Sequence, residues 1–188
     1  MTKTATEREY NLKNLKDVSP HLKDIEYFLF FGTLLGLCRE NNIIEGDDDV
    51  DLLVNCQHKN QILEIITNLG FNISINNPHI VQGTRYINNK LTHIDFYFYE
   101  NPMDQSYIVE KWNFFSRPFD TNYHLHIPKD IIYPLATGQI GGIECKIPLN
   151  IKECCKFLYG ERYMTPMKMK TQYMVERLHN NKPEVKYY

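Results

Sequence analysis

The 188-residue chain lacks several features that would place it in a specialised class of protein. It has no apolar run long enough to span a membrane, and its polar first residues, 1–16, lack the apolar core of a signal peptide. The net charge of -2 provides no basic field for gripping nucleic acid, so a nucleic-acid partner is not expected. There is no internal repeat or low-complexity tract. These absences predict an ordinary globular domain in the cytoplasm.

The spacing of the cysteines matches no known zinc-binding or disulfide pattern. The five cysteines are an odd number and form no C-x-x-C pair, so neither a zinc site nor a disulfide framework is indicated. With no secretion signal, we expect reduced thiols in a cytosolic protein. The residues are Cys38, Cys56, Cys145, Cys154 and Cys155.

Strand and helix signals alternate in the first half of the chain, and the second half is irregular and rich in proline and glycine. This pattern predicts a single α/β (α+β) domain. We expect one amphipathic helix or two short ones at 7–24. Further helices are expected at 34–40 with Thr33 as the N-cap, at 60–69, at 151–159 capped by Asn150, and from the closing segment to about 178. We expect strands at 26–31, 49–54, 71–75, 80–86 and 91–99, and a hairpin at 137–147 that turns at Gly141-Gly142.

The most unusual segment places four carboxylates in five residues, directly before the apolar strand signal Leu52-Leu53-Val54. Two carboxylates about 7 Å apart repel by roughly 2 kcal/mol at an effective dielectric near 20. Such a cluster needs either water or a cation. If the strand begins early, Asp47, Asp49 and Asp51 share one face, as a divalent-metal site requires, and Asp48 faces solvent.

Two further segments carry groups that would complete such a site. Gly32-Thr33 at a predicted helix start offers backbone N–H groups to a phosphate. Asp95, on the predicted strand 91–99, is a third acid that acts either as a metal ligand or as the base for a hydroxyl proton. Acids from neighbouring strands can hold two divalent ions for in-line displacement at phosphorus, and Mg²⁺ suits such oxygen ligands.

The stretch FFGTLLGLCRENNIIEGDDDVDLLV, residues 30–54, resembles the signature of the LicD/fukutin family of the nucleotidyltransferase-fold superfamily. His93 to Phe96 resembles the later strand that supplies the superfamily's third acid. Residues 148–166 are similar to the family's closing segment. The matching elements of the signature are Gly32 to Gly36, Arg39, Ile43-Ile44, Asp47, Asp49 and Asp51.

The resemblance implies a nucleotidyltransferase-like domain at 26–166, with a short, mixed, twisted sheet flanked by helices. An N-terminal helical segment, 1–25, would precede it, and a C-terminal helix and tail, 167–188, would follow. It implies a metal-dependent phosphotransferase that moves a phospho-alcohol, such as phosphocholine or a polyol phosphate. The donor would be CDP-activated, the acceptor a glycan or another hydroxyl compound, and the cofactor Mg²⁺ or Mn²⁺.

The resemblance also implies roles for individual residues. The metal ligands would be Asp47, Asp49, Asp51 and Asp95, and the last three would form the catalytic set. Gly32, Thr33 and Arg39 would bind the donor. Where the family usually has Pro-Trp before its acids, this chain has Glu45-Gly46, which removes an aromatic wall and adds a charge. The N-terminal membrane anchor of animal members is absent as well, so we expect a cytosolic, bacterial-type or viral protein.

Three other interpretations stay open at this point. The acid run taken alone also fits a solvated turn, although not an EF-hand loop, because Leu52 and His58 stand where glycine and glutamate are required. The enzyme could instead transfer a nucleotidyl group to a small molecule, a protein or an RNA end. A non-catalytic nucleotide-binding domain is the third possibility.

Overall fold

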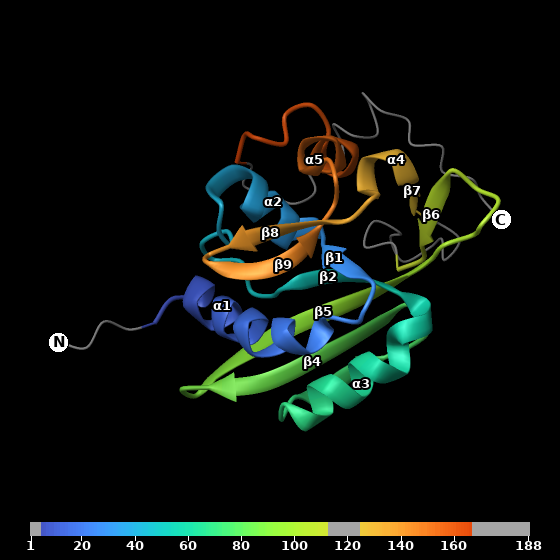
Figure 1. Cartoon of the computed structure of the whole chain (residues 1–188). Helices are drawn as coiled ribbons and strands as arrows, with labels where there is room; N and C mark the ends of the chain where they lie inside the picture. The colour runs from blue at the N-terminus through green and yellow to red at the C-terminus, as the bar shows by residue number, and fades with distance from the viewer. Residues whose placement is uncertain (1–4, 113–124, 167–188) are drawn as a thin grey trace, which may run out of the picture.

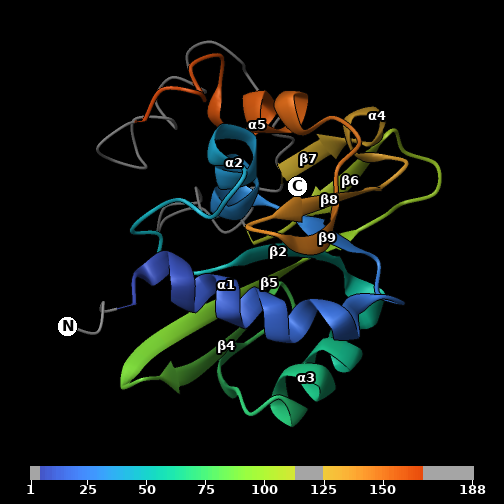
Figure 2. The ribbon, with the colours of Figure 1, turned by 60° about the vertical axis from the view of Figure 1, so that its left-hand side comes forward.

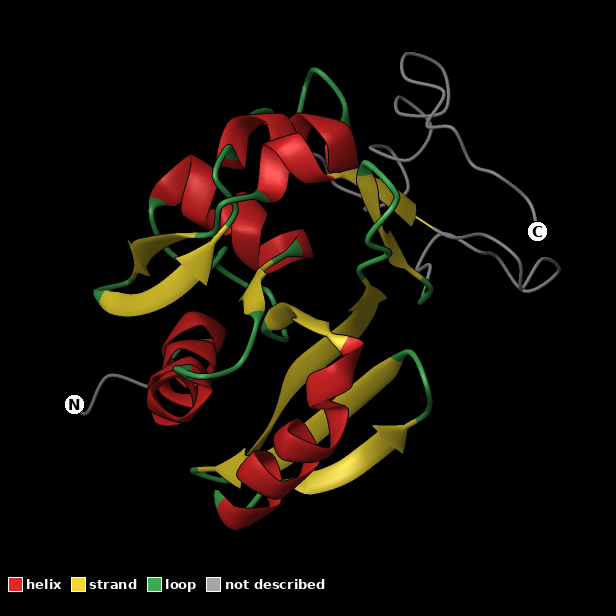
Figure 3. Cartoon of the chain, turned by 45° about the vertical axis from the view of Figure 1, so that its right-hand side comes forward, coloured by secondary structure: helices red, strands yellow, loops and turns green. Residues whose placement is uncertain are grey.

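A computed structural model describes residues 5–112 and 125–166 of the chain. Its main sheet has seven strands, and a two-stranded hairpin lies apart from it (Figure 3). The strands are β1 Tyr27–Leu29, β2 Asp51–Asn55, β3 Asn72–Asn76, β4 Ile80–Ile87, β5 Lys90–Glu100, β6 Tyr107–Glu110, β7 Leu125–Pro128, β8 Ala136–Ile140 and β9 Ile143–Ile147. The helices are α1 Glu7–Val18, α2 Phe31–Glu40, α3 Lys59–Asn68, α4 Lys129–Ile132 and α5 Ile151–Tyr159, with short 3₁₀ turns at Ser19–Leu22 and Cys56–His58.

The sheet is mixed, as predicted. Five strands follow the order β1-β2-β5-β4-β3, and β6 joins β5 to β7. Strands β2 and β5 are parallel, whereas the other neighbours are antiparallel. The parallel pair brings the start of β2 beside the middle of β5, which is far from it in the sequence.

Helices α1 and α3 cover the same face of the sheet (Figures 1 and 2). Helix α1 is capped by Thr6 in a capping box completed by Glu9, and it packs on β5. From β4, Arg85 reaches Asn14 of α1, and a Cβ at Gly83 would touch Ile66 of α3. Since side chains alternate along a strand, residues 82, 84 and 86 face the opposite side of the sheet.

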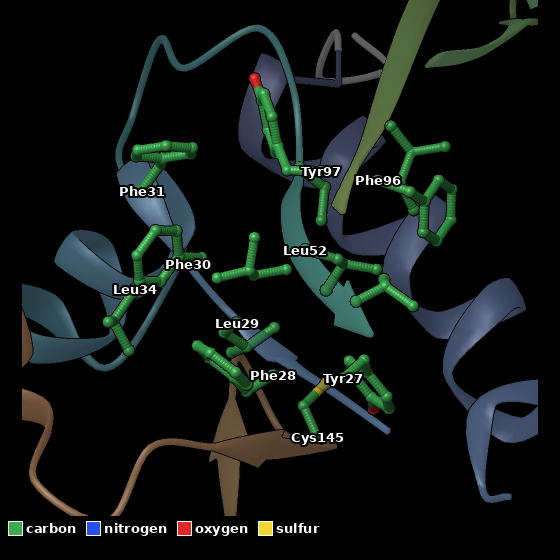
Figure 4. Close-up of a cluster of buried hydrophobic side chains, with 14 of the residues drawn as sticks. Tyr27, Phe28, Leu29, Phe30, Phe31, Leu34, Leu52, Phe96, Tyr97 and Cys145 are labelled. Carbon is green, nitrogen blue, oxygen red and sulfur yellow. The ribbon is translucent and has the colours of Figure 1, made fainter. Parts of the chain in front are cut away.

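An aromatic cluster fills the interior between β1, α2 and β5. The side chains of Phe28 and Phe30 are fully buried, and their rings meet edge to face at 5.7 Å (Figure 4). At one end of this cluster Phe31 packs against Tyr97, with ring centroids 4.9 Å apart. The start of α2 is thereby fixed against β5.

The local sequence signals placed most elements well. Helix α5 is capped at its start by Asn150, whose side chain accepts from the Glu153 N–H at 3.2 Å, and at its end by Gly160. The β8–β9 hairpin turns at Gly141-Gly142, where φ is 55° and 81°. Among the residues that the structure describes, no helix is long and apolar enough to cross a membrane. The predicted helix in 167–188 lies outside the described residues.

Three predicted boundaries were wrong. The first strand is only Tyr27–Leu29, because Phe30 already caps the next helix. Helix α2 begins at Phe31, so Thr33 lies inside its first turn and is not its N-cap. Strand β2 begins at Asp51, and the acids before it lie in a loop.

Candidate active site

Two of the predicted acids lie on the parallel strands β2 and β5. Asp51 is directly paired with Asp95 in the strand register, and each is only 5% exposed. Asp49 lies in the loop just before β2, and one carboxylate oxygen from each of Asp49, Asp51 and Asp95 lies within 4.8 Å of the other two. The structure therefore brings Asp95 together with two acids that lie more than forty residues earlier in the sequence.

The remaining acids of the run form a second, overlapping group. Carboxylate oxygens of Asp47, Asp48 and Asp49 also lie within 4.8 Å of one another. Asp48 is exposed, as predicted, but it does not face away from the other acids. Because Asp47 to Val50 lie in a loop, strand alternation does not gather these acids; the path of the loop does.

Helix α1 anchors the acidic loop at two points. The Asn11 side chain donates to the Asp47 carbonyl at 2.8 Å, and the Arg8 guanidinium donates to the Ile43 carbonyl at 2.6 Å. Glu45, the additional charge just before the acids, forms an ion pair with Arg8 at 3.5 Å. That unusual charge is thus part of the loop's attachment to α1.

The end of α2 turns the chain back toward its own beginning. Asn41 caps the helix in the left-handed conformation, with φ of 53°. A Cβ at Gly36 would lie 2.5 Å from the Asn42 carbonyl oxygen, so the returning chain passes too close to the helix for any side chain there. This close approach directs the acidic loop back to the start of α2.

Gly32 lies against the acids. Its backbone N–H donates to Asp51 Oδ2 at 2.9 Å, and a Cβ at Gly32 would lie 2.7 Å from Asp47 Oδ2. The N-terminus of α2 therefore points its partial positive charge at the carboxylates. A side chain at this position would displace the Asp47 carboxylate from its place among the acids.

Thr33 and Arg39 differ from what was expected of donor-binding residues. The Thr33 side chain is fully buried, and its Oγ1 accepts from the Asp51 backbone N–H at 2.8 Å, so this hydroxyl holds the start of β2. The Arg39 guanidinium donates to the carbonyls of Tyr163 and Thr165. It thereby ties α2 to the segment after α5, because its planar group can span both carbonyls.

Two residues that the sequence did not single out as partners of Asp95 contact both of its oxygens. Gln82 Nε2 donates to Oδ1 at 2.9 Å, and the Tyr97 hydroxyl donates to Oδ2 at 3.2 Å. Burial raises the pKa of Asp95 to about 6, and the charge of Asp49 adds to this, although the two hydrogen bonds oppose it. Burial also raises the pKa of Tyr97, with the charge of Asp51 adding to the effect, so its phenol stays protonated and donates.

The chemistry of these groups fits a divalent cation. Carboxylate oxygens are the ligands that Mg²⁺ and Mn²⁺ prefer, and Asp51 and Asp95 are mostly removed from water. Mutual repulsion raises the free energy of the gathered carboxylates, and a bound cation would remove that repulsion. The structure thus supports an acidic cluster able to bind a metal ion.

Comparison with known proteins points to one family. The family profile described as LicD/FKTN/FKRP, nucleotidyltransferase domain, matches residues 24–150. Uncharacterized protein RT0683 of Rickettsia typhi is 32% identical over 108 residues, which make up 48% of this chain and 34% of that protein. The chain spans about a third of the length of this relative.

Solved structures show where the fold belongs. The lincomycin-bound lincosamide antibiotic adenylyltransferase LnuA aligns over 77% of this chain and 82% of its own, with a TM-score of 0.52 and 14% identity. The solution structure of the antibiotic-resistance factor ANT(2'')-Ia aligns over 90% and 81%, with a TM-score of 0.53 and 11% identity. A crystal structure of ANT(2'')-Ia in complex with adenylyl-2''-tobramycin aligns over 89% of this chain and 84% of its own, with a TM-score of 0.52 and 12% identity. At these identities the likeness concerns the nucleotidyltransferase fold.

Proposed function

Because the chain belongs to the LicD/FKTN/FKRP family, we propose that it is a transferase of phosphorus-containing groups that depends on Mg²⁺ or Mn²⁺. The proposed reaction moves a phospho-alcohol, such as phosphocholine or a polyol phosphate, from a CDP-activated donor to a hydroxyl of a glycan. One observation carries this proposal: a carboxylate oxygen from each of Asp49, Asp51 and Asp95 lies within 4.8 Å of the other two. Asp51 and Asp95 are also almost fully buried.

Asp49 and Asp51, joined by Asp47, are the proposed metal ligands. A bound Mg²⁺ or Mn²⁺ would supply charge that screens the phosphate oxygens and stabilises the leaving group. Gly32 keeps the space beside these acids open and orients Asp51 through its N–H. Thr33 supports the same acid from behind, through the Asp51 backbone.

Asp95 has two possible parts in this reaction, as a further ligand or as the base. As the base it would take the proton of the acceptor hydroxyl while that oxygen bonds to the phosphorus that carries the alcohol. The bond from this phosphorus to the bridging oxygen would break, and cytidine monophosphate would leave. A carboxyl whose pKa is raised to about 6 is better suited to accept a proton than an ordinary aspartate.

The face of the sheet opposite α1 and α3 offers a place for the acceptor. Starting at Gln82, next to Asp95, this face continues along β4 to Tyr86, which is 70% exposed. Leu91, paired with Tyr86 across the hairpin, is 40% exposed. The distance along the strand is about 13 Å, which is enough for several sugar rings. Polar side chains with an exposed aromatic ring suit a glycan, since its rings have both hydroxyl and apolar C–H surfaces.

Release of cytidine monophosphate from CDP-choline, CDP-glycerol and CDP-ribitol tests the proposal without knowledge of the acceptor, because water can replace it. We expect Mn²⁺-dependent release by the wild type and a loss of roughly 100-fold or more in Asp49→Asn and Asp51→Asn. Asp24→Asn, at an exposed aspartate before β1, is the matched control and should keep wild-type activity. Equal release by the wild type and both acid variants would exclude the proposed site.

Nucleotidyl transfer is the second candidate, and it is favoured by the adenylyltransferase fold of the solved neighbours. The mass of the product separates the two reactions, since the acceptor gains either a phospho-alcohol or a nucleoside monophosphate. A non-catalytic domain that only binds nucleotide is less well supported, because the acids of the site are intact and gathered.

A further inference from the structure

Asp95 is held by two uncharged donors, one on each oxygen. Gln82 is its register partner on β4, and the amide nitrogen reaches Oδ1 at 2.9 Å. The Tyr97 hydroxyl, from the same strand as Asp95, reaches Oδ2 at 3.2 Å. A carboxylate bound at both ends cannot rotate freely about its terminal torsion, so its plane is defined.

The orientation of the Gln82 amide is itself determined by a third residue. The Ser74 hydroxyl, on the neighbouring strand β3, donates to Gln82 Oε1 at 2.8 Å. An ionised carboxylate accepts hydrogen bonds only, so Nε2 must face Asp95 and Oε1 must face Ser74. A chain of hydrogen bonds therefore crosses three strands, from the exposed edge of the sheet to the acids.

The neutral character of these partners is informative. Asp17, an acid of the opposite face, is paired with Arg85 at 2.6 Å and with Lys13 at 3.0 Å, which balances its charge. Within residues 5–112 and 125–166, Asp95 is in no ion pair. An amide and a phenol orient the carboxylate but leave its negative charge available to a cation.

We propose that Gln82, with its amide locked by Ser74, is a positioning residue that orients Asp95 toward a metal ion shared with Asp49 and Asp51. This inference rests on the proposed function and extends it to a residue outside the acidic cluster. Partners in the second layer around a metal commonly change affinity by about 10- to 100-fold when removed. Gln82→Leu removes the donor while keeping a side chain of similar size, so Asp95 retains only Tyr97.

Calorimetric titration of the full chain with Mn²⁺ tests this role, with the melting temperature in EDTA measured in parallel. We expect Gln82→Leu to raise the Mn²⁺ Kd about 10-fold or more at an unchanged melting temperature. Ser74→Ala should raise the Mn²⁺ Kd less, because the Gln82 amide can then rotate but can still donate to Asp95. Thr84→Val is the matched control on the same strand and face; its hydroxyl reaches only the Asn72 carbonyl, at 3.3 Å, and its Kd should equal that of the wild type.

A merely structural role would lower the melting temperature of Gln82→Leu and leave the Mn²⁺ Kd unchanged, which would overturn the inference but not the proposed function. Absence of Mn²⁺ binding by the wild type would remove both. If Gln82→Leu does not fold, Ser74→Ala provides the test, because Ser74 is exposed and its replacement should not disturb folding. A Mn²⁺ Kd of Ser74→Ala equal to that of the wild type would then contradict the inference. Where activity is measurable, a fall in kcat at an unchanged KM would also support positioning.

Discussion

Replacing Asp95 by asparagine should stabilise the metal-free protein at neutral pH, although Asp95 is central to the proposed site. The reason is that Asp95 is 5% exposed and faces the carboxylate of Asp49, so its ionised form is costly in the folded state. Asparagine has nearly the same shape and no charge. A residue retained for binding a cation should therefore destabilise the protein when the cation is absent.

The size of the effect follows from the pKa. Burial first, and then the charge of Asp49, raises the pKa of Asp95 from 3.8 to about 6, which corresponds to about 3 kcal/mol of stability lost when it ionises. Asparagine has one acceptor oxygen instead of two, so one of the donors Gln82 and Tyr97 loses its partner, at a cost of about 1 kcal/mol. The expected net gain for Asp95→Asn at pH 8 is about 2 kcal/mol.

The sign depends on pH in a defined way. Because the folded-state pKa is raised, the folded protein binds the proton more tightly than the unfolded chain does. The corresponding stability is fully present below about pH 4 and is lost as the pH rises through about 6. The advantage of Asp95→Asn should thus be absent near pH 4, appear between pH 5 and 7, and be complete at pH 8.

Urea denaturation in EDTA at pH 4, 6 and 8 measures this difference. Asp17→Asn is the control with the opposite sign. Burial opposes ionisation of Asp17, but hydrogen bonds from Lys13 and Arg85 hold its pKa below its usual range. Loss of this carboxylate in Asp17→Asn should therefore lower the free energy of unfolding at pH 8. Adding Mn²⁺ at about 100 times its Kd should stabilise the wild type by about 2.7 kcal/mol and Asp95→Asn by less. A lower free energy of unfolding for Asp95→Asn than for the wild type at pH 8 in EDTA would refute the argument.

Three further substitutions probe the geometry of the site and of the surfaces around it. Gly32→Ala places a Cβ 2.7 Å from Asp47 Oδ2, so we expect Mn²⁺ affinity by calorimetry to fall about 10-fold, and unchanged affinity would contradict the close approach. Gly36→Ala meets the Asn42 carbonyl at 2.5 Å and should cost roughly 1–3 kcal/mol in urea denaturation, since backbone must move. Tyr86→Ala, at a 70% exposed side chain, should leave Mn²⁺ binding and CMP release into water unchanged but raise the KM for a glycan acceptor several-fold. An unchanged KM would exclude Tyr86 from the acceptor surface.

Much of the architecture could be predicted because it depends on local signals. Helix α5 follows from the cap at Asn150 and the stop at Gly160, and the hairpin follows from Gly141-Gly142, whose positive φ values glycine adopts easily. The acidic run and Gly32 were visible as residues whose charge or lack of a side chain demands a special environment. These features act over a few residues, so a single stretch of sequence contains their cause.

Other features depend on contacts between distant segments. The sequence suggested Thr33 as a cap, but the helix begins at Phe31, whose ring packs on Tyr97, and the buried Thr33 hydroxyl accepts from the Asp51 backbone. Arg39 looked like a donor-binding group, yet the fold places the Tyr163 carbonyl beside it. Neither partner is near in sequence, so no local pattern could reveal it.

The amino-acid sequence by itself determined which groups the protein has for chemistry: the acids 47 to 51, the small residue at 32 and the later Asp95. Only the tertiary structure decided how they meet. The parallel pairing of β2 with β5 sets Asp51 opposite Asp95, and the antiparallel pairing of β4 with β5 sets Gln82 against the same acid. Strand register is selected by burial of whole faces of the sheet, so it is a property of the packed molecule and not of any one segment.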